Sequence, residues 1–135
     1  VTYERDSAEL LRTMRDRDIL VEINLTSNAV ILGVQGWEHP FVEYMKAGVP
    51  VALSTDDYGV LRTDLTQEYT RAASTYNLSY ADLKRMSYNS VRYSFHPDRA
   101  ALEAELDRRF EEFEASHVDA VKLRERPRPF WESTP

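Results

Sequence analysis

The sequence contains no cysteine. This absence excludes disulfide bonds, thiolate metal sites and cysteine nucleophiles. No apolar run approaches the roughly 20 residues that a membrane-spanning helix needs, so we expect no membrane partner. The first residues, Val1 to Asp6, form neither an initiator methionine nor a signal peptide, so we expect the chain to be cut from something longer. We assign it to the cytoplasm, although a chain without cysteine also suits a secreted or periplasmic location.

Positive charge is also scarce. Lysine and arginine number 17 against 23 aspartates and glutamates, which gives a formal net charge of −6. A negative surface repels phosphate backbones, so we expect no nucleic-acid partner. Basic residues gather locally only in the proline-containing stretch 122–135, which has no apolar period. We therefore divide the chain into a folded part, residues 1–121, and a basic tail, residues 122–135.

The chain does contain short apolar runs typical of strands. The β-branched run 19–25 predicts a strand that ends in a polar turn at Thr26-Ser27-Asn28. A helix is expected to begin near His39-Pro40 and to end at Gly48, and a second strand follows over 49–54. A further helix over 7–17 precedes the first strand. Helices and strands that alternate with brief connections are typical of a parallel α/β sheet.

The remainder of the chain is predicted to be helical. Helices are expected over 63–75, after Ser79 with Asp82 as a capping box, and from Pro97 onward. The helix after Ser79 is expected to bury four side chains, Leu83, Met86, Val91 and Phe95. Two parallel strands do not form a stable sheet alone, because such strands are normally flanked by neighbours and covered on both faces. The chain therefore has the pattern of one part of a larger α/β fold.

Two adjacent carboxylates, Asp56 and Asp57, directly follow the second strand. In α/β barrels and open α/β sheets, ligands and catalysis are found at this end of the strands. In an extended chain the two side chains would point opposite ways, so one could face a metal and the other a substrate. An aspartate pair is also common in ordinary turns and helix caps, and from the residues alone that interpretation is favoured.

Several segments, taken in order, resemble the adenosine deaminase family of the metal-dependent amidohydrolases. The matching pieces run from the first strand to the last helices: Leu25-Thr26-Ser27-Asn28, His39-Pro40, Ala47-Gly48-Val49-Pro50-Val51, Ser54-Thr55-Asp56-Asp57, Glu68-Tyr69, Asn89-Ser90 and Ser94-Phe95. An ordered series is more specific than any single piece. The run after the aspartate pair, Tyr58 to Arg62, is more similar to the branch related to adenosine deaminase growth factors.

The resemblance implies the C-terminal portion of a (β/α)8 TIM barrel, with residues 19–25 as strand 7 and 49–54 as strand 8. It implies a zinc-dependent hydrolase that converts adenosine to inosine and ammonia. By motif, Asp56 matches the aspartate that binds the zinc, and Asp57 matches the residue that contacts the purine at N7. Ser27 and Asn28 match a turn that supports the pocket. The family's histidine ligands and its catalytic glutamate have no counterpart in this chain.

A chain with one zinc ligand is expected to be inactive alone, since a catalytic zinc has about three protein ligands. The expected partners are a purine nucleoside and either the remainder of the barrel or further copies of the chain, which would cover exposed apolar edges. Three alternatives stay open: AMP or adenine as the substrate, a non-catalytic interaction domain derived from the same barrel, and a small self-sufficient α/β binding domain.

Overall fold

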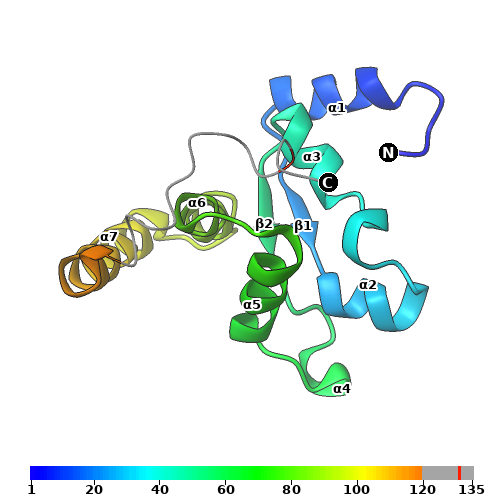
Figure 1. Cartoon of the computed structure of the whole chain (residues 1–135). Helices are drawn as coiled ribbons and strands as arrows, with labels where there is room; N and C mark the ends of the chain where they lie inside the picture. The colour runs from blue at the N-terminus through cyan, green and yellow to red at the C-terminus, as the bar shows by residue number, and fades with distance from the viewer. Residues whose placement is uncertain (120–130, 132–135) are drawn as a thin grey trace.

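The computed structural model describes residues 1–119 and residue 131 (Figure 1). Its elements, in chain order, are α1 (Ser7–Asp16), β1 (Val21–Ile23), α2 (Leu25–Leu32), the 3-10 helix η1 (Gly36–Glu38), α3 (Phe41–Ala47), β2 (Val51–Leu53), α4 (Tyr58–Leu61), α5 (Leu65–Tyr76), α6 (Tyr80–Arg92) and α7 (Arg99–Ser116). The basic tail and the boundary before it lie outside the described residues, apart from Trp131, so that division stays a prediction.

The two strands pair in parallel, as the sequence predicts. Ile23 lies opposite Leu53, and the Ser54 amide continues the ladder by donating a 2.9 Å hydrogen bond to the Ile23 carbonyl. The connection between the strands contains α2, η1 and α3, as expected for a parallel crossover. Both strand ends therefore lie at the same edge of the sheet, where α2 and the segment leading to α4 begin (Figure 1).

One face of the sheet is packed against helices. Ile23, Val51 and Leu53 are at most 4% exposed, and they belong to the same apolar core as residues of α3, α5 and α6. These helix residues include Phe41, Met45, Ala72, Tyr76 and Met86. Because strand side chains alternate between faces, the neighbouring residues of both strands must point the other way.

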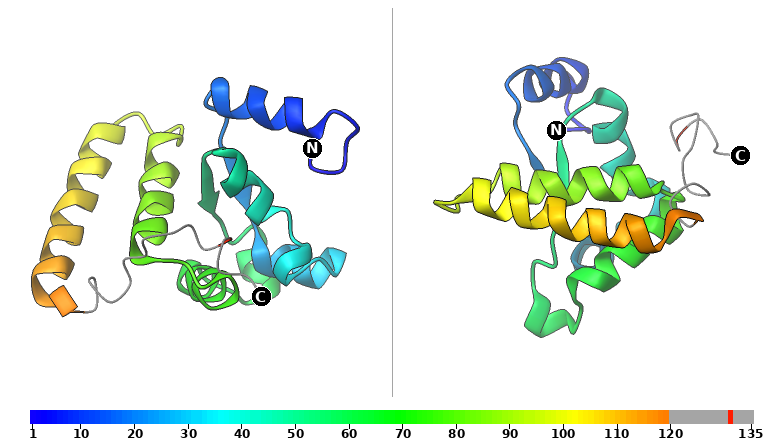
Figure 2. Two further views of the ribbon diagram at one scale, coloured as in Figure 1. Left: turned by 45° about the horizontal axis from the view of Figure 1, so that its top comes forward. Right: turned by 90° about the vertical axis from the view of Figure 1, so that its left-hand side faces the viewer.

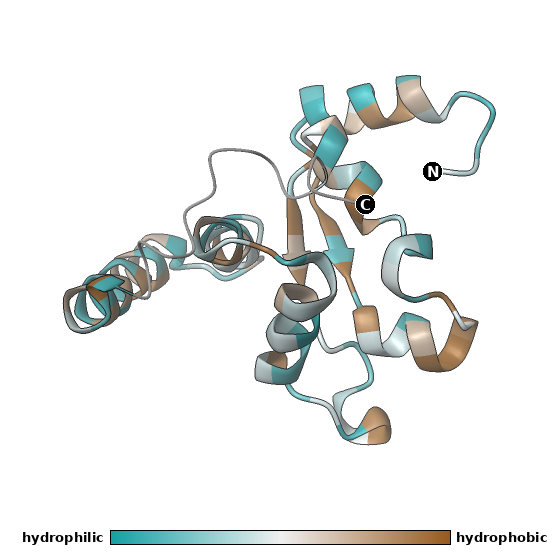
Figure 3. Ribbon diagram, in the orientation of Figure 1, coloured by the Kyte–Doolittle hydropathy of each residue, from teal (hydrophilic) through white to brown (hydrophobic). Residues whose placement is uncertain are grey.

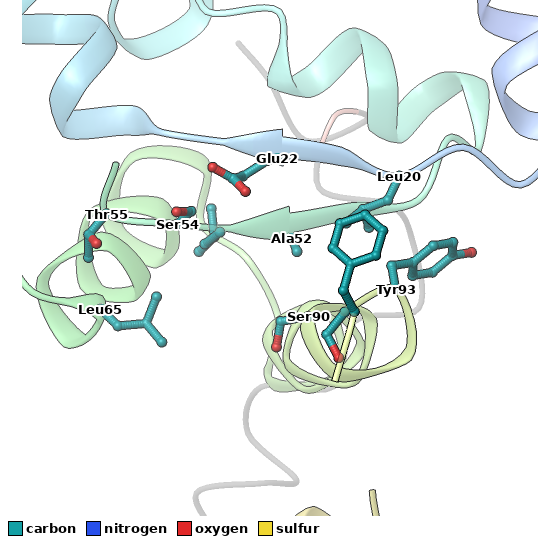
Figure 4. Close-up of a pocket in the computed structure, with 11 residues that line it drawn as sticks. Leu20, Glu22, Ala52, Ser54, Thr55, Leu65, Ser90 and Tyr93 are labelled. Carbon is teal, nitrogen blue, oxygen red and sulfur yellow. The ribbon is translucent and has the colours of Figure 1, made fainter. Parts of the chain in front are cut away.

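The opposite face of the sheet borders an open pocket (Figure 4). The pocket has a volume of about 780 Å³. Its lining includes four residues at alternate strand positions, Leu20, Glu22, Ala52 and Ser54. The residues that follow α6, among them Phe95, line its other side. Helices thus cover one face of the sheet. The other, which we call the open face, borders the pocket; Glu22 is exposed on it, whereas Ala52 is only 4% exposed.

The segment after β1 is a helix, so the predicted polar turn at Thr26-Ser27-Asn28 is wrong. β1 ends at Ile23, two residues earlier than predicted, and the Asn24 carbonyl accepts a hydrogen bond from the amide four residues later at 2.9 Å. β-branched residues in the second half of α2 favour a strand by propensity. Gly33 has a left-handed backbone with φ 68°, which is a common helix ending and the signal that could have revealed α2.

Two other helix boundaries agree with the sequence. The predicted helix before Gly48 is confirmed as α3, and Gly48 has φ 74°. At the start of α6, the Ser79 side chain accepts from the Asp82 amide and the Asp82 side chain accepts from the Ser79 amide, both at 3.1 Å. This reciprocal pair is the predicted capping box.

Helix α6 lies against β2, and α7 lies alongside α6 on the outside of the molecule (Figure 2). The Asn89 side chain donates a 2.9 Å hydrogen bond to the Val51 carbonyl and so ties α6 to β2. Rings of α6 and α7 stack on each other, with Tyr88 and Phe110 centroids 5.5 Å apart. The predicted burial of Phe95 is wrong: α6 ends at Arg92, and Phe95 is fully exposed beyond it.

Apolar side chains are also exposed at the second half of α2 and on α4 (Figure 3). Val30, Ile31 and Leu32 are each more than half exposed, and Val60 is 81% exposed. Within the part of the chain that the structure describes, every helix is too short or too polar to cross a lipid bilayer. These exposed apolar residues therefore form surface patches on a mixed α/β unit.

Candidate functional site

Asp56 lies just beyond β2, in a tight turn. The Ser54 hydroxyl accepts a 3.3 Å hydrogen bond from the Asp56 amide, and the backbone of Asp56 is left-handed with φ 52°. Aspartate tolerates this conformation better than most residues. The backbone is therefore not extended here, and the expectation that strand alternation separates Asp56 from Asp57 is wrong in its premise. The two carboxylates nevertheless have different surroundings.

The Asp56 carboxylate is held by a residue of α2, the helix that follows β1. Its Oδ2 accepts a 2.8 Å hydrogen bond from the hydroxyl of Ser27, a residue of α2 that is only 3% exposed. No described residue donates a hydrogen bond to the other oxygen, Oδ1. Asp56 thus presents one fixed carboxylate with one oxygen free to bind a further group.

Asp57 is exposed and stands at the start of α4. Its backbone carbonyl accepts hydrogen bonds from the Val60 and Leu61 amides, at 3.1 and 2.9 Å. Within the described residues its carboxylate has no hydrogen-bond or ion-pair partner. Its side chain is therefore available for a ligand from outside this part of the chain.

The first turn of α2 connects three separate elements to the site. The Thr26 amide donates to Glu68 of α5 at 3.2 Å, and Ser27 donates to Asp56. The Asn28 side chain lies 2.8 Å from Nε2 of His39. Ser27 and Asn28, the two residues predicted to support the pocket, therefore lie together in one helical turn, with Ser27 in direct contact with Asp56.

Glu68 is a buried carboxylate at the base of this arrangement. It is fully buried, and it also accepts a 3.1 Å hydrogen bond from the hydroxyl of Thr63. The sequence predicts no role for Glu68, although Glu68-Tyr69 belongs to the segments that resemble the family. The signal was present: Glu68 shares the buried helical stripe with Ala72 and Tyr76, at intervals of four residues.

His39 is 3% exposed and joins α2 to α3. Its Nδ1 lies 3.1 Å from the Phe41 amide and must accept that hydrogen. A neutral ring with an accepting Nδ1 carries its proton on Nε2, and the Asn28 Nδ2 lies 2.8 Å from that atom. Two donors do not bond to each other, so the Asn28 amide group must be turned about its terminal bond to offer its oxygen to the ring. Burial lowers the pKa of His39 from its ordinary value of 6.5, because the charged ring loses hydration.

The lowered pKa of His39 predicts a pH-dependent stability. The unfolded chain binds a proton at a higher pH than the folded one, so His39 stabilises the fold above pH 6.5 and this contribution is lost as the pH falls through the lowered pKa. We expect the midpoint of thermal unfolding to drop between pH ~7.5 and ~5, and to drop less in a His39→Gln variant. Equal drops in the two proteins would contradict this account.

The described residues offer few donors for a metal ion. Within the described residues, no three histidine, cysteine, aspartate or glutamate side chains come together as a metal site. Asp56 offers one carboxylate oxygen, whereas catalytic zinc has about three protein ligands. The described residues therefore do not form a complete zinc site by themselves.

Comparison with known proteins identifies the family. The family model for adenosine deaminase matches residues 2–108, which is most of the chain. An adenosine deaminase of Enterococcus faecalis is 33% identical over 100 residues, and the human N6-methyl-AMP deaminase is 36% identical over 101 residues. The chain belongs to the adenosine deaminase family.

The same comparisons show how much of the relatives this chain represents. The matched region covers 73% of this chain but 30% of the E. faecalis enzyme, and 74% of this chain but 28% of the human protein. A solved structure of the N6-methyl-AMP deaminase from Arabidopsis thaliana superposes with a TM-score of 0.68 at 28% identity. That superposition covers 85% of this chain and 33% of the plant enzyme. The matched region therefore spans about a third or less of the length of these relatives.

Proposed function

We propose that this chain is the C-terminal part of a zinc-dependent deaminase that hydrolyses adenosine to inosine and ammonia. In this proposal β1 and β2 are strands 7 and 8 of a (β/α)8 barrel. The observation that carries the proposal is Asp56, which is fixed by Ser27 at the carboxyl end of β2 with one oxygen free. Active sites of such barrels lie at the carboxyl ends of the strands.

Asp56 is proposed as the metal ligand. Ser27 occupies Oδ2, so Oδ1 is the atom available to a cation. Hydroxyl groups that hold a ligating carboxylate in this way fix its orientation. A bound zinc supplies a water acidic enough to act as a nucleophile near neutral pH. Asn28 supports the same turn through His39.

Asp57 is proposed to contact the purine at N7. A ring nitrogen is an acceptor, so a proton must lie between N7 and the Asp57 carboxyl group, either on the acid or on the base. The exposed position of Asp57 and its lack of a partner within the described residues support this role. Asp57 would then orient the base, while Asp56 serves the metal.

We use the term complete deaminase for the full-length protein, which contains this chain and the further residues that bring it to the length of its relatives. The isolated chain is expected to contain no stoichiometric zinc and to show no loss of adenosine absorbance. The complete deaminase is expected to bind about one zinc per chain and to turn over adenosine. Turnover by the isolated chain would refute the assignment of the remaining ligands to sequence outside it. The exposed apolar surfaces of this chain are expected to be covered either by the remainder of the same barrel or by further copies of this chain.

A second substrate class has support from particular relatives. The human protein and the plant structure to which this chain is similar are N6-methyl-AMP deaminases. An aspartate that contacts N7 does not distinguish adenosine from AMP, adenine or N6-methyl-AMP, because these compounds share the purine ring. We therefore expect the ratio of kcat/KM values for these compounds, measured on the complete deaminase, to decide the substrate.

A further inference from the structure

We propose that Glu22 binds a cationic side chain from the part of the deaminase outside this chain and positions it over the open face of the sheet. This inference rests on the proposed function in one respect: the remaining length of the protein is taken to cover that face. The cation would be a lysine, an arginine or a histidine.

Glu22 stands in the middle of the open face (Figure 4). It lies on β1 opposite Ala52, and it is exposed, in contrast to its neighbour Ile23, which is 2% exposed. Among the described residues that line the pocket, Glu22 is the one charged side chain. No hydrogen bond or ion pair reaches its carboxylate from any residue in the described part of the chain.

Glu22 lies close to the candidate site. It lies level with Ala52, two residues before Ser54, which corresponds to about 7 Å along the strand. The turn that holds Asp56 begins at Ser54. A side chain bound to Glu22 would therefore lie next to the layer of side chains at the carboxyl end of the sheet.

Covering this face would remove water from the carboxylate. A buried carboxylate without a partner destabilises a fold because it has lost its hydration, and a well-placed cation offsets that loss. The other polar groups of the described lining are hydroxyls, of which Ser54 already accepts from the Asp56 amide. Neutral hydroxyls compensate a buried negative charge less well than a cation does.

Charge and length identify the occupant as the rest of the deaminase. Two copies of the chain packed face to face would bring Glu22 against Glu22, and each chain has a formal net charge of −6. Like charges in direct opposition disfavour that dimer. The relatives are more than three times as long as the region they share with this chain. The remaining length of chain is therefore the better match to the open face.

A crystal structure of the complete deaminase tests the pairing without relying on activity. We expect a lysine, arginine or histidine nitrogen within about 4 Å of the Glu22 carboxylate. A carboxylate that meets only water, hydroxyls or backbone amides would overturn the proposal. If the pair is present but no purine is deaminated, the proposed function fails and the pairing stands. If purines are deaminated and Glu22 is unpaired, the pairing fails and the function stands.

Variants separate the charge of Glu22 from its shape. Glu22→Gln keeps the shape and removes the charge, and we expect the thermal midpoint of the complete deaminase to fall by roughly 5 °C while its zinc content is unchanged. Glu22→Asp keeps the charge and should lose less. If Glu22 served only in packing, Glu22→Asp would lower the thermal midpoint more than Glu22→Gln, and that result would overturn the proposal. Glu111→Gln, on the exposed surface of α7, is the matched control and should change neither property.

Discussion

Replacing Asp56 with alanine in the complete deaminase is expected to remove the bound zinc and to lower kcat/KM by at least about a thousand-fold. The loss follows because a catalytic metal contributes several kcal/mol to the transition state, and each 1.36 kcal/mol is a factor of ten in rate. The measurements are metal content by atomic emission and steady-state kinetics on adenosine. The Ser54 side chain accepts from the backbone amide of Asp56, which alanine keeps, so the turn itself should persist in the variant.

Substitutions at two residues next to Asp56 in the structure or the sequence help to interpret this result. Ser27→Ala removes the hydrogen bond to Oδ2 and leaves Oδ1 in place, so a loss of roughly 10- to 100-fold in metal affinity or activity is expected. Asp57→Asn should retain zinc and lose activity. A non-catalytic interaction domain would show no turnover before or after the substitutions, and none of the three variants would change its zinc content. That outcome would favour the interaction domain over the deaminase.

Replacing Glu68 with leucine is expected to lower the free energy of unfolding by about 3 kcal/mol, because one buried and one partly buried donor are left without an acceptor. These donors are the Thr26 amide and the Thr63 hydroxyl. The change also releases the first turn of α2, which holds Ser27 against Asp56, so weaker zinc binding should accompany the loss of stability. Urea denaturation and zinc titration of the complete deaminase measure the two effects.

Matched variants test whether the hydrogen bonds of Glu68 cause the effect. In Glu68→Gln one oxygen can still accept from Thr26, while the amide can donate to the Thr63 hydroxyl, so the cost should be about 1 kcal/mol. Gln67→Leu places the same apolar side chain at the neighbouring, exposed position of α5 and should be nearly neutral. If Glu68→Leu were also neutral, Glu68 would not be the anchor of α2.

The sequence predicted those elements whose signals are local. The runs 19–25 and 49–54 contain β1 and β2, because β-branched and apolar residues are concentrated there. α3 was predicted from Pro40 at its start and Gly48 at its end, which act within one turn of the helix. The capping box that begins α6 is equally local. Asp56 was placed correctly after β2 for the same reason.

The parts that sequence reasoning missed depend on contacts between distant residues. The first turn of α2 was predicted as a polar turn, but its Thr26 amide is satisfied by Glu68, which is 42 residues away in the sequence. Phe95 was expected in the core because it continued an apolar spacing, yet α6 ends three residues before it. Such tertiary contacts override local propensity.

Anomalous diffraction at the zinc absorption edge, from crystals of the complete deaminase, tests the central claim most directly. The account predicts a zinc peak about 2.0–2.2 Å from a carboxylate oxygen of Asp56, with Ser27 still bound to the other oxygen and the remaining ligands supplied by residues outside this chain. An Asp56 carboxylate that faces open solvent, with the zinc bound elsewhere or absent from crystals of active enzyme, would contradict it.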